Sequence, residues 1–252
     1  MRYPRLLIPR IAVWRSTTDL HIGGPNSRFV LSRVPPRLCD IVPLLDGCHS
    51  VDDLAQTCDP QWISWLLGCL QSHHLLAEGV ARPQSVDIRV DGEGRLANAV
   101  AALVPRGRSG QVLHIVATAT VETDRVLIAD LNRQRVPYLV LRADEHGASV
   151  GPFVIPGQTS CVTCQDLTRR AVDPTWPVQV FQLARLDATP DPGLCYWAGA
   201  TALAHVTAYA HGRVPESAST TIEMSAEEGR VTYRAWPVHP KCRYHGGTAG
   251  GS

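Results

Sequence analysis

Two pairs of metal-binding residue types, far apart in the chain, most constrain how it can fold. Cys161 and Cys164 stand three residues apart, directly after a Pro-Gly turn. Cys242 and His245 stand at the same spacing near the far end of the sequence. Two thiolates on a tight turn are half of a tetrahedral zinc site, and the other half must come from a distant segment. The sequence therefore predicts a structural zinc ion that joins the two segments.

The residues alone leave the fourth ligand open. His245 is the first choice, with Cys195 and His239 as alternatives. The competing interpretation is that the thiols at 161 and 164 are simply small, half-buried apolar side chains. Four further cysteines stand among apolar neighbours, as core thiols do in a reducing compartment, and not in a disulfide framework: Cys39, Cys48, Cys58 and Cys69.

Composition indicates an ordinary water-soluble protein. The 252 residues suffice for one large or two small domains, and 44% of them are hydrophobic. A net charge of +1 gives no general affinity for polyanions. The sequence has no apolar run of transmembrane length and no secretory signal, so we expect a cytoplasmic protein without membrane attachment.

The first 77 residues predict a domain of three short strands followed by three helices. Apolar alternation indicates strands near residues 7–13, 20–22 and 29–31. Helical spacing begins at residue 38, and Ser50 and Asp59 are typical helix N-caps. This order predicts a winged-helix-type domain.

A winged helix often binds DNA, but the third helix of this domain is unsuited to DNA. Residues 61–76 contain no Lys or Arg, whereas a helix in the major groove needs cations. An apolar helix beside an edge strand instead suits an extended peptide that joins the sheet. The alternative is that the tryptophans are core residues and the strand arginines are solvated. The predicted peptide-facing residues are Arg28, Phe29, Val30, Leu31 and Arg33 on the strand, and Trp62, Trp65, Leu66, Cys69 and His73 on the helix.

Residues 86–246 predict an α/β domain with a truncated Rossmann-type arrangement, and residues 247–252 predict a flexible tail. Gly92, Gly94 and Ala97 match G-x-G-x-x-A between a strand and a helix. A working nucleotide site also needs an acidic residue after the following strand for the ribose, and none stands there. We therefore expect no ATP binding.

The chain resembles a known family along nearly its whole length. G-P-F-V-I-P-G-x-x-x-C-x-x-C (151–164), D-P-x-W-P (173–177) and W-P-x-H-P-x-C (236–242) are similar to landmarks of ThiF-like, ubiquitin-activating-type domains of peptide natural-product clusters, called Ocin-ThiF-like. V-W-R (13–15) and L-D-G (45–47) are similar to the leader-peptide recognition element of that biosynthesis. The family's zinc site ends in C-x-C, whereas this chain has Tyr244 at the second of those positions.

The resemblance implies a non-catalytic protein. Such proteins bind the leader of a ribosomally made precursor peptide and present it to a YcaO-type cyclodehydratase, which makes azolines. The resemblance is also compatible with a homodimer that forms through the ThiF-like domain. Three other functions compete, in falling order: a ThiF-type adenylating enzyme, a zinc-dependent hydrolase without an H-E-x-x-H motif, and a winged-helix regulator.

Overall fold

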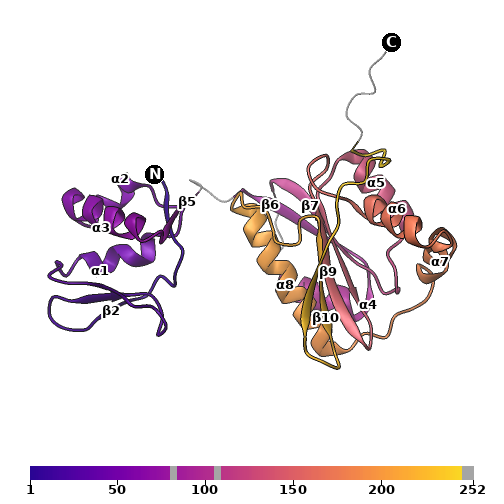
Figure 1. Cartoon of the computed structure of the whole chain (residues 1–252), viewed down its shortest axis with the longest axis horizontal. Coiled ribbons are helices and arrows are strands. Elements are labelled where there is room, and N and C mark those ends of the chain that lie inside the picture. The colour runs from indigo at the N-terminus through magenta and orange to yellow at the C-terminus, as the bar shows by residue number, and fades with distance from the viewer. Residues whose placement is uncertain (80–83, 105–108, 246–252) are drawn as a thin grey trace, which may run out of the picture. The chain divides into compact units, whose positions relative to one another are not determined.

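The computed structural model describes residues 1–79, 84–104 and 109–245. The chain divides into two compact units, Met1–Pro83 and Gln84–Ser252, and each is described by itself (Figure 1). The tail predicted at 247–252 lies outside the described residues. Within the described residues, none of the helices combines the length and apolar character that crossing a membrane requires.

A three-stranded antiparallel sheet forms one side of the first unit. Its strands are β2 (Ala12–Trp14), β3 (Leu20–Ile22) and β4 (Phe29–Leu31), in the order β2-β3-β4. The central strand points Leu20 and Ile22 into the core, where both are fully buried. The strands predicted at 20–22 and 29–31 are confirmed. Among the described residues β4 pairs only with β3, so its other edge is unpaired.

Helices pack against this sheet. They are α1 (Leu38–Ile41), the 3-10 turn η1 (Val42–Leu44), α2 (Val51–Leu54) and α3 (Pro60–Ser72). Ser50 forms a capping box with Asp53, and the Asp59 side chain accepts the Gln61 N–H group, as the N-cap pattern predicts. The single helix expected at 38–45 divides into α1 and η1, because Pro43 has no N–H group to continue an α-helix.

Two short strands that the sequence analysis missed join the ends of the first unit. β1 (Pro4–Leu6) pairs antiparallel with β5 (Leu76–Glu78). Pro4 in β1, and Ala77 and Glu78 in β5, are residue types that are depleted in strands, so strand propensity gives no signal there.

The second unit is built on a mixed six-stranded sheet in the order β11-β10-β9-β8-β7-β6. β6, β7 and β8 are parallel, and β8 to β11 pair antiparallel. The strands are β6 (Val86–Asp91), β7 (Gln111–Ala117), β8 (Tyr138–Ala143), β9 (Gly147–Val154), β10 (Thr220–Ser225) and β11 (Val231–Ala235). The predicted α/β class is confirmed.

Helices cover both faces of this sheet. On one face lie α4 (Gly94–Leu103) and α8 (Pro192–Ala210), and on the other α5 (Arg125–Gln134) and α6 (Val162–Val172), followed by α7 (Trp176–Leu183) (Figure 1). α5 begins at Arg125 because Asp124 caps it by accepting the Val126 N–H group. Asp191 likewise caps α8 by accepting the N–H groups of Gly193 and Leu194.

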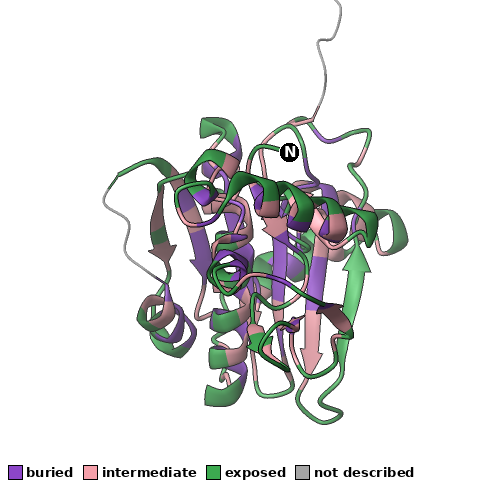
Figure 2. Cartoon of the chain, turned by 90° about the vertical axis from the view of Figure 1, so that its left-hand side faces the viewer, coloured by how far each residue is buried: buried purple, intermediate pink, exposed green. Residues whose placement is uncertain are grey.

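Buried residues concentrate on the central strands of the six-stranded sheet (Figure 2). At one edge, every residue of β11 is exposed, and among the described residues β11 pairs only with β10. One side of the sheet therefore ends in a free, solvated strand.

Gly47 offers a test of the first unit's packing. It has φ +85°, and an added Cβ would lie 3.1 Å from the Gly79 Cα and 3.0 Å from the Arg5 Cβ. We expect Gly47→Ala to lower the unfolding free energy by about 1–2 kcal/mol, because alanine is strained at this φ.

The matched control is Gly68→Ala, in the exposed part of α3, where an added Cβ meets nothing within 4 Å. This change should raise the unfolding free energy by about 1 kcal/mol through helix propensity. Urea unfolding of the full chain measures both. Equal effects of the two changes would contradict the close approach of Gly47 to β5.

Candidate functional site

Cys161 and Cys164 lie where β9 turns into α6. Cys161 is the N-cap residue of α6, and Cys164 lies in its first turn, so the two thiols are on the same side of the helix end. The turn is fixed by Thr159, whose Oγ1 accepts the Ile155 N–H group at 2.8 Å and donates to the Phe153 carbonyl at 3.1 Å. The local sequence thus presents both thiols at a rigid strand-to-helix junction.

Cys242 and His245 arrive from the segment that follows β11. Trp236 anchors this segment, because its Nε1 donates to Thr221 Oγ1 on β10 at 2.8 Å. Two successive turns follow, in which Cys242 N–H donates to the His239 carbonyl and His245 N–H donates to the Cys242 carbonyl. Residues 239–245 are thereby folded back over the beginning of α6.

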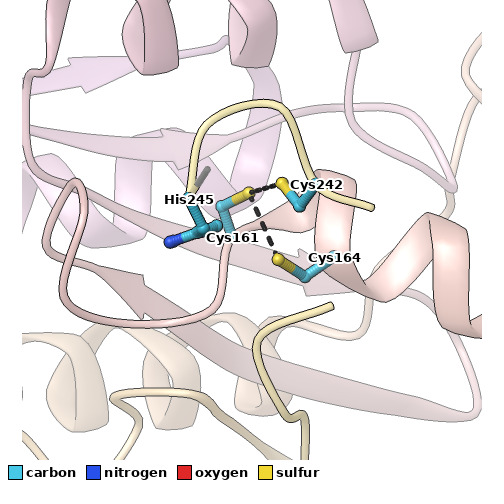
Figure 3. A group of neighbouring side chains, drawn as sticks. All are labelled: Cys161, Cys164, Cys242 and His245. Atoms are coloured by element: carbon cyan, nitrogen blue, oxygen red, sulfur yellow. Dashed lines mark hydrogen bonds between the residues drawn. The ribbon is translucent and has the colours of Figure 1, made fainter. Parts of the chain in front are cut away.

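The four side chains converge on one point (Figure 3). Their ligand atoms all lie within 4.8 Å of one another. Cys161 Sγ is 3.9 Å from Cys164 Sγ and 3.7 Å from Cys242 Sγ. The three cysteines are buried and His245 is half-buried. The structure therefore brings together the four residues that the sequence analysis chose first.

Burial and mutual contact set the protonation of the thiols. A hydrogen bond from Cys161 lowers the pKa of Cys164 to about 5. The same hydrogen bond, together with burial, raises the pKa of Cys161, and burial raises that of Cys242. One thiolate is thus already favoured at neutral pH, and it lies beside two further sulfur donors.

The donor set fits zinc. A tetrahedral zinc ion with Zn–S bonds of about 2.3 Å would hold its sulfur ligands about 3.8 Å apart, close to both observed separations. Among the described residues, the buried Nε2 of His245 has no hydrogen-bond partner. An unsatisfied buried imidazole nitrogen is costly unless it has a ligand role. The three thiols and the His245 imidazole form a Cys₃His cluster that could hold a metal ion.

The other candidate ligands lie elsewhere. Cys195 is on α8, in the core cluster on the opposite face of the sheet. His239 is outside the Cys₃His cluster, and its Nδ1 accepts the Lys241 N–H group at 3.2 Å. Tyr244 packs against the core beside the cluster. The geometry therefore selects His245 among the alternatives that the sequence left open.

The glycine loop between β6 and α4 has a packing reason of its own. Gly92 has φ +135°, and an added Cβ would lie 2.0 Å from the Ala117 carbonyl oxygen at the end of β7. Only glycine fits this approach of two parallel strands. The match to a nucleotide motif therefore does not by itself indicate a phosphate site.

A second segment covers the carboxyl end of β7, where a Rossmann-type site would hold its ligand. Ala188 N–H donates to the Ala119 carbonyl at 2.7 Å, and Val121 N–H donates to the Leu186 carbonyl at 2.9 Å. Beside this pairing remains a cavity of about 310 Å³. Arg95 lines the cavity, and its guanidinium donates to the Pro190 carbonyl at 3.4 Å.

In the first unit, β4 and α3 lie beside each other. The rings of Phe29 and His73 meet edge to face with centroids 5.1 Å apart. Trp62 and Trp65 form a similar pair at 5.4 Å, and Trp65 is 41% exposed. The exposed Trp65 therefore lies on the helix whose C-cap residue His73 contacts β4, a strand with one unpaired edge.

Burial refines the predicted peptide-facing set. Leu66 is fully buried and Leu31 nearly so, and both belong to the core of the first unit. Direct contact between Leu66 and a peptide is thus not available, because the amphipathic helix points it inward. Arg28 and Arg33 are exposed, whereas Cys69 is half-buried.

The sequence analysis missed a buried ion cluster in the second unit. Glu122 is 6% exposed and contacts three arginines: Arg125, Arg142 and Arg169. Burial alone would raise the pKa of Glu122, but the three guanidiniums outweigh it, so the pKa lies below its ordinary value. These residues span 48 positions of the sequence without a shared motif, so no local signal could have grouped them.

No family model and no curated protein sequence matches this chain. Solved structures resemble it at low sequence identity. The heterocyclase TruD is 15% identical with a TM-score of 0.59, covering 98% of this chain and 43% of TruD. A heterocyclase in complex with substrate and cofactor is also 15% identical, with a TM-score of 0.57 and coverages of 96% and 39%. This chain thus spans less than half the length of either heterocyclase.

A second group of similar structures matches over their full length. E. coli MccB is 13% identical with a TM-score of 0.57, covering 100% of this chain and 99% of MccB. The Microcin C7 biosynthetic enzyme MccB in complex with N-formylated MccA is 12% identical with a TM-score of 0.54, covering 96% and 99%. At these identities the likeness establishes the fold: this chain has a mixed α/β architecture similar to that of MccB and of part of TruD.

Proposed function

We propose that this protein binds the leader of a ribosomally synthesised precursor peptide and presents it to a YcaO-type cyclodehydratase, without catalysing a reaction itself. The observation that carries the proposal is the unpaired edge of β4, whose Phe29 contacts His73 at the end of α3, the helix that also carries the exposed Trp65. The fold likeness supports it, since MccB has been solved with the peptide MccA and a similar heterocyclase with its substrate.

The peptide would join the sheet of the first unit along β4. Main-chain pairing gives affinity, and pockets for alternate side chains give specificity. Phe29 and Leu31 are partly or fully buried towards the helices, whereas Val30, between them, lies on the other sheet face with His21. Alternate peptide side chains would therefore approach α3 near Trp65, Cys69 and His73, and the rest would approach Arg28.

Charge in the first unit indicates which peptides fit. Residues 1–37 contain seven arginines and one acidic residue, whereas residues 38–79 contain six acidic residues and no Lys or Arg. The cations thus belong to the part of the unit that contains β1 to β4, and a 320 Å³ cavity on the sheet is lined by Arg15, His21 and Arg28. A leader with acidic residues on its sheet-facing side would match this surface.

DNA binding is disfavoured by the same distribution. α3 would be the recognition helix, and residues 61–76 offer no cation for phosphate or base contacts.

Adenylation is disfavoured by the nucleotide region. The three residues directly after β7, Thr118, Ala119 and Thr120, include no acidic residue, and the first acidic residue beyond them, Glu122, is paired with arginines. Arg95 is engaged by the Pro190 carbonyl, and the chain's single lysine, Lys241, belongs to the segment near the Cys₃His cluster. A transferring phosphoryl group would meet Arg95 in this cavity but not the lysine, whereas its transition-state charge calls for several preorganised cations.

Zinc in the Cys₃His cluster would be structural. All four ligands come from the protein, which leaves no open coordination position for hydrolysis. Bound zinc would supply folding energy by joining α6 to the segment after β11.

The leader surface predicts the effect of two substitutions. Trp65→Ala should weaken binding of the leader encoded by a neighbouring short Cys/Ser/Thr-rich reading frame by about tenfold or more, as loss of an aromatic anchor does. Arg28→Glu should weaken binding mainly at low salt, because the interaction is screened. Fluorescence anisotropy with the full chain and labelled leader measures both.

Two control variants in the second unit should leave binding unchanged. Tyr196→Ala removes a 58% exposed aromatic side chain, and Arg213→Glu reverses an exposed charge. If a chain lacking residues 1–76 binds the leader as tightly as the full chain, the proposed peptide surface is wrong.

ATP binding separates the recruiter from the adenylating enzyme. Titration calorimetry should detect no micromolar binding of ATP with magnesium, with E. coli MccB, solved with ATP, as the positive control. Micromolar binding by this chain would restore adenylation as the leading function.

Metal content tests the Cys₃His cluster. Elemental analysis should find one zinc per chain, and chelation should lower the melting temperature. Cys161→Ser should lose zinc, whereas Cys195→Ser, at an equally buried thiol, should retain it. Purified protein without zinc, or equal zinc loss in both variants, would end this assignment.

A further inference from the structure

A polar groove crosses the face of the six-stranded sheet that carries α6. Cross-strand pairing aligns one row of side chains along its floor: Arg142 is paired with Ser149, Ser149 with Glu223, and Glu223 with Thr232. The row runs from β8 across β9 and β10 to β11. All four residues line one cavity of about 570 Å³.

The inner end of the groove carries a surplus positive charge. Glu122 contacts Arg142, Arg169 at 3.2 Å and Arg125 at 3.1 Å. Arg125 is also held by both oxygens of Asp166, at 2.8 and 2.9 Å. Three guanidiniums therefore face two carboxylates. Asp166 balances Arg125, so Arg142 and Arg169 share the single charge of Glu122. Both of these arginines line the cavity.

The Arg169 guanidinium contacts two tryptophan rings and keeps hydrogen-bond donors that have no protein partner among the described residues. Its guanidinium lies 4.5 Å from the ring centre of Trp176 and 5.3 Å from that of Trp236. Within the described part of the chain, its Nη1 donates to Glu122 and its Nε and Nη2 have no partner. Burial and the like charge of Arg142 lower the pKa of Arg169. An anion bound here would offset the repulsion between the two guanidiniums.

The acidic residues of the groove are otherwise engaged. Glu223 pairs with Arg234 at 3.6 Å, and Glu228 pairs with Arg230 at 2.7 Å. Asp144 accepts the N–H groups of its own turn, from His146 and Gly147. At the inner end, therefore, Arg142 and Arg169 share a single carboxylate, whereas Asp144, at the β8–β9 turn, is satisfied by backbone N–H groups without a cationic partner among the described residues.

The outer end opens at the free edge of the sheet. Thr232 lies on β11, whose residues are all exposed. Three strand spacings separate β8 from β11, about 14 Å at ~4.8 Å each, which is the span of roughly four extended residues. The groove thus has the length and polarity for a narrow linear chain.

We propose that this groove binds an extended peptide segment whose carboxylate reaches Arg142 and Arg169. The carboxylate belongs either to a chain terminus or to an acidic side chain. The identification of this peptide as the modified part of the precursor rests on the proposed function, but the groove itself does not. One protein would then hold its peptide at two places, the leader on the first unit and a carboxylate-bearing segment on the second.

Three synthetic peptides test the proposal on the full chain. They are fluorescein-labelled Ser-Gly-Ser-Gly-Ser with a free carboxylate, the same peptide amidated, and an amidated peptide ending in Asp. Anisotropy at low salt should show at least tenfold tighter binding of a carboxylate-bearing peptide than of the amidated one. The free-terminus and Asp peptides distinguish the two sources of the carboxylate.

Two substitutions locate the binding. Arg142→Gln should weaken carboxylate binding about tenfold, while Glu122 keeps two arginine partners so that the fold is retained. Thr232→Trp should block the outer end of the groove without touching the ion cluster. Its matched control is Tyr233→Trp, the next residue of the exposed strand, on the opposite sheet face.

Several outcomes would overturn the proposal. They are equal binding of acid and amide, no binding of any peptide at millimolar concentration, or binding that survives both Arg142→Gln and Thr232→Trp. Displacement of the peptide by inorganic phosphate at lower concentration would assign the arginines to phosphate instead. Leader binding that is lost in Trp65→Ala but kept in Arg142→Gln separates this groove from the proposed leader surface.

Discussion

The second unit depends on the convergence of two segments that are about 80 residues apart. Cys161 and Cys164 begin α6, and Cys242 and His245 close the chain over it. Bringing such distant segments together costs loop-closure entropy, which hydrophobic contact around three small thiols offsets only in part. A buried imidazole nitrogen without a protein partner within the described residues adds a further cost. A bound metal ion would offset both costs, and the observed sulfur separations match tetrahedral zinc geometry.

The segment after β11 that carries Cys242 and His245 also shapes the surface beside it. Trp236 anchors the last segment on Thr221 and packs against the Arg169 guanidinium. The same tryptophan thus connects the Cys₃His cluster to the inner end of the polar groove. Rigid guanidiniums cost less to order when they bind, so stability at one site contributes to preorganisation at the other.

The α/β fold is similar to that of E. coli MccB, which has been solved with ATP. Gly92 is needed because two parallel strands approach closely, whatever the ligand. The 186–188 segment pairs with residues 119–121 over the place where a nucleotide would lie. Structures similar in fold include heterocyclases and MccB, so the architecture by itself does not decide between recruiting a peptide and modifying it.

The sequence by itself determined the α/β class, the helix starts at Ser50 and Asp59, and the first-choice metal ligands. These depend on short-range signals: capping residues, strand alternation and the spacing of soft donors. Only the tertiary structure decided that His245 and not Cys195 completes the cluster, since the two lie on different sides of the sheet. The tertiary structure also buries Leu66 in the core of the first unit, and it brings Glu122 together with three arginines from α5, β8 and α6. Burial and long-range charge pairing arise from packing between elements, which no local pattern encodes.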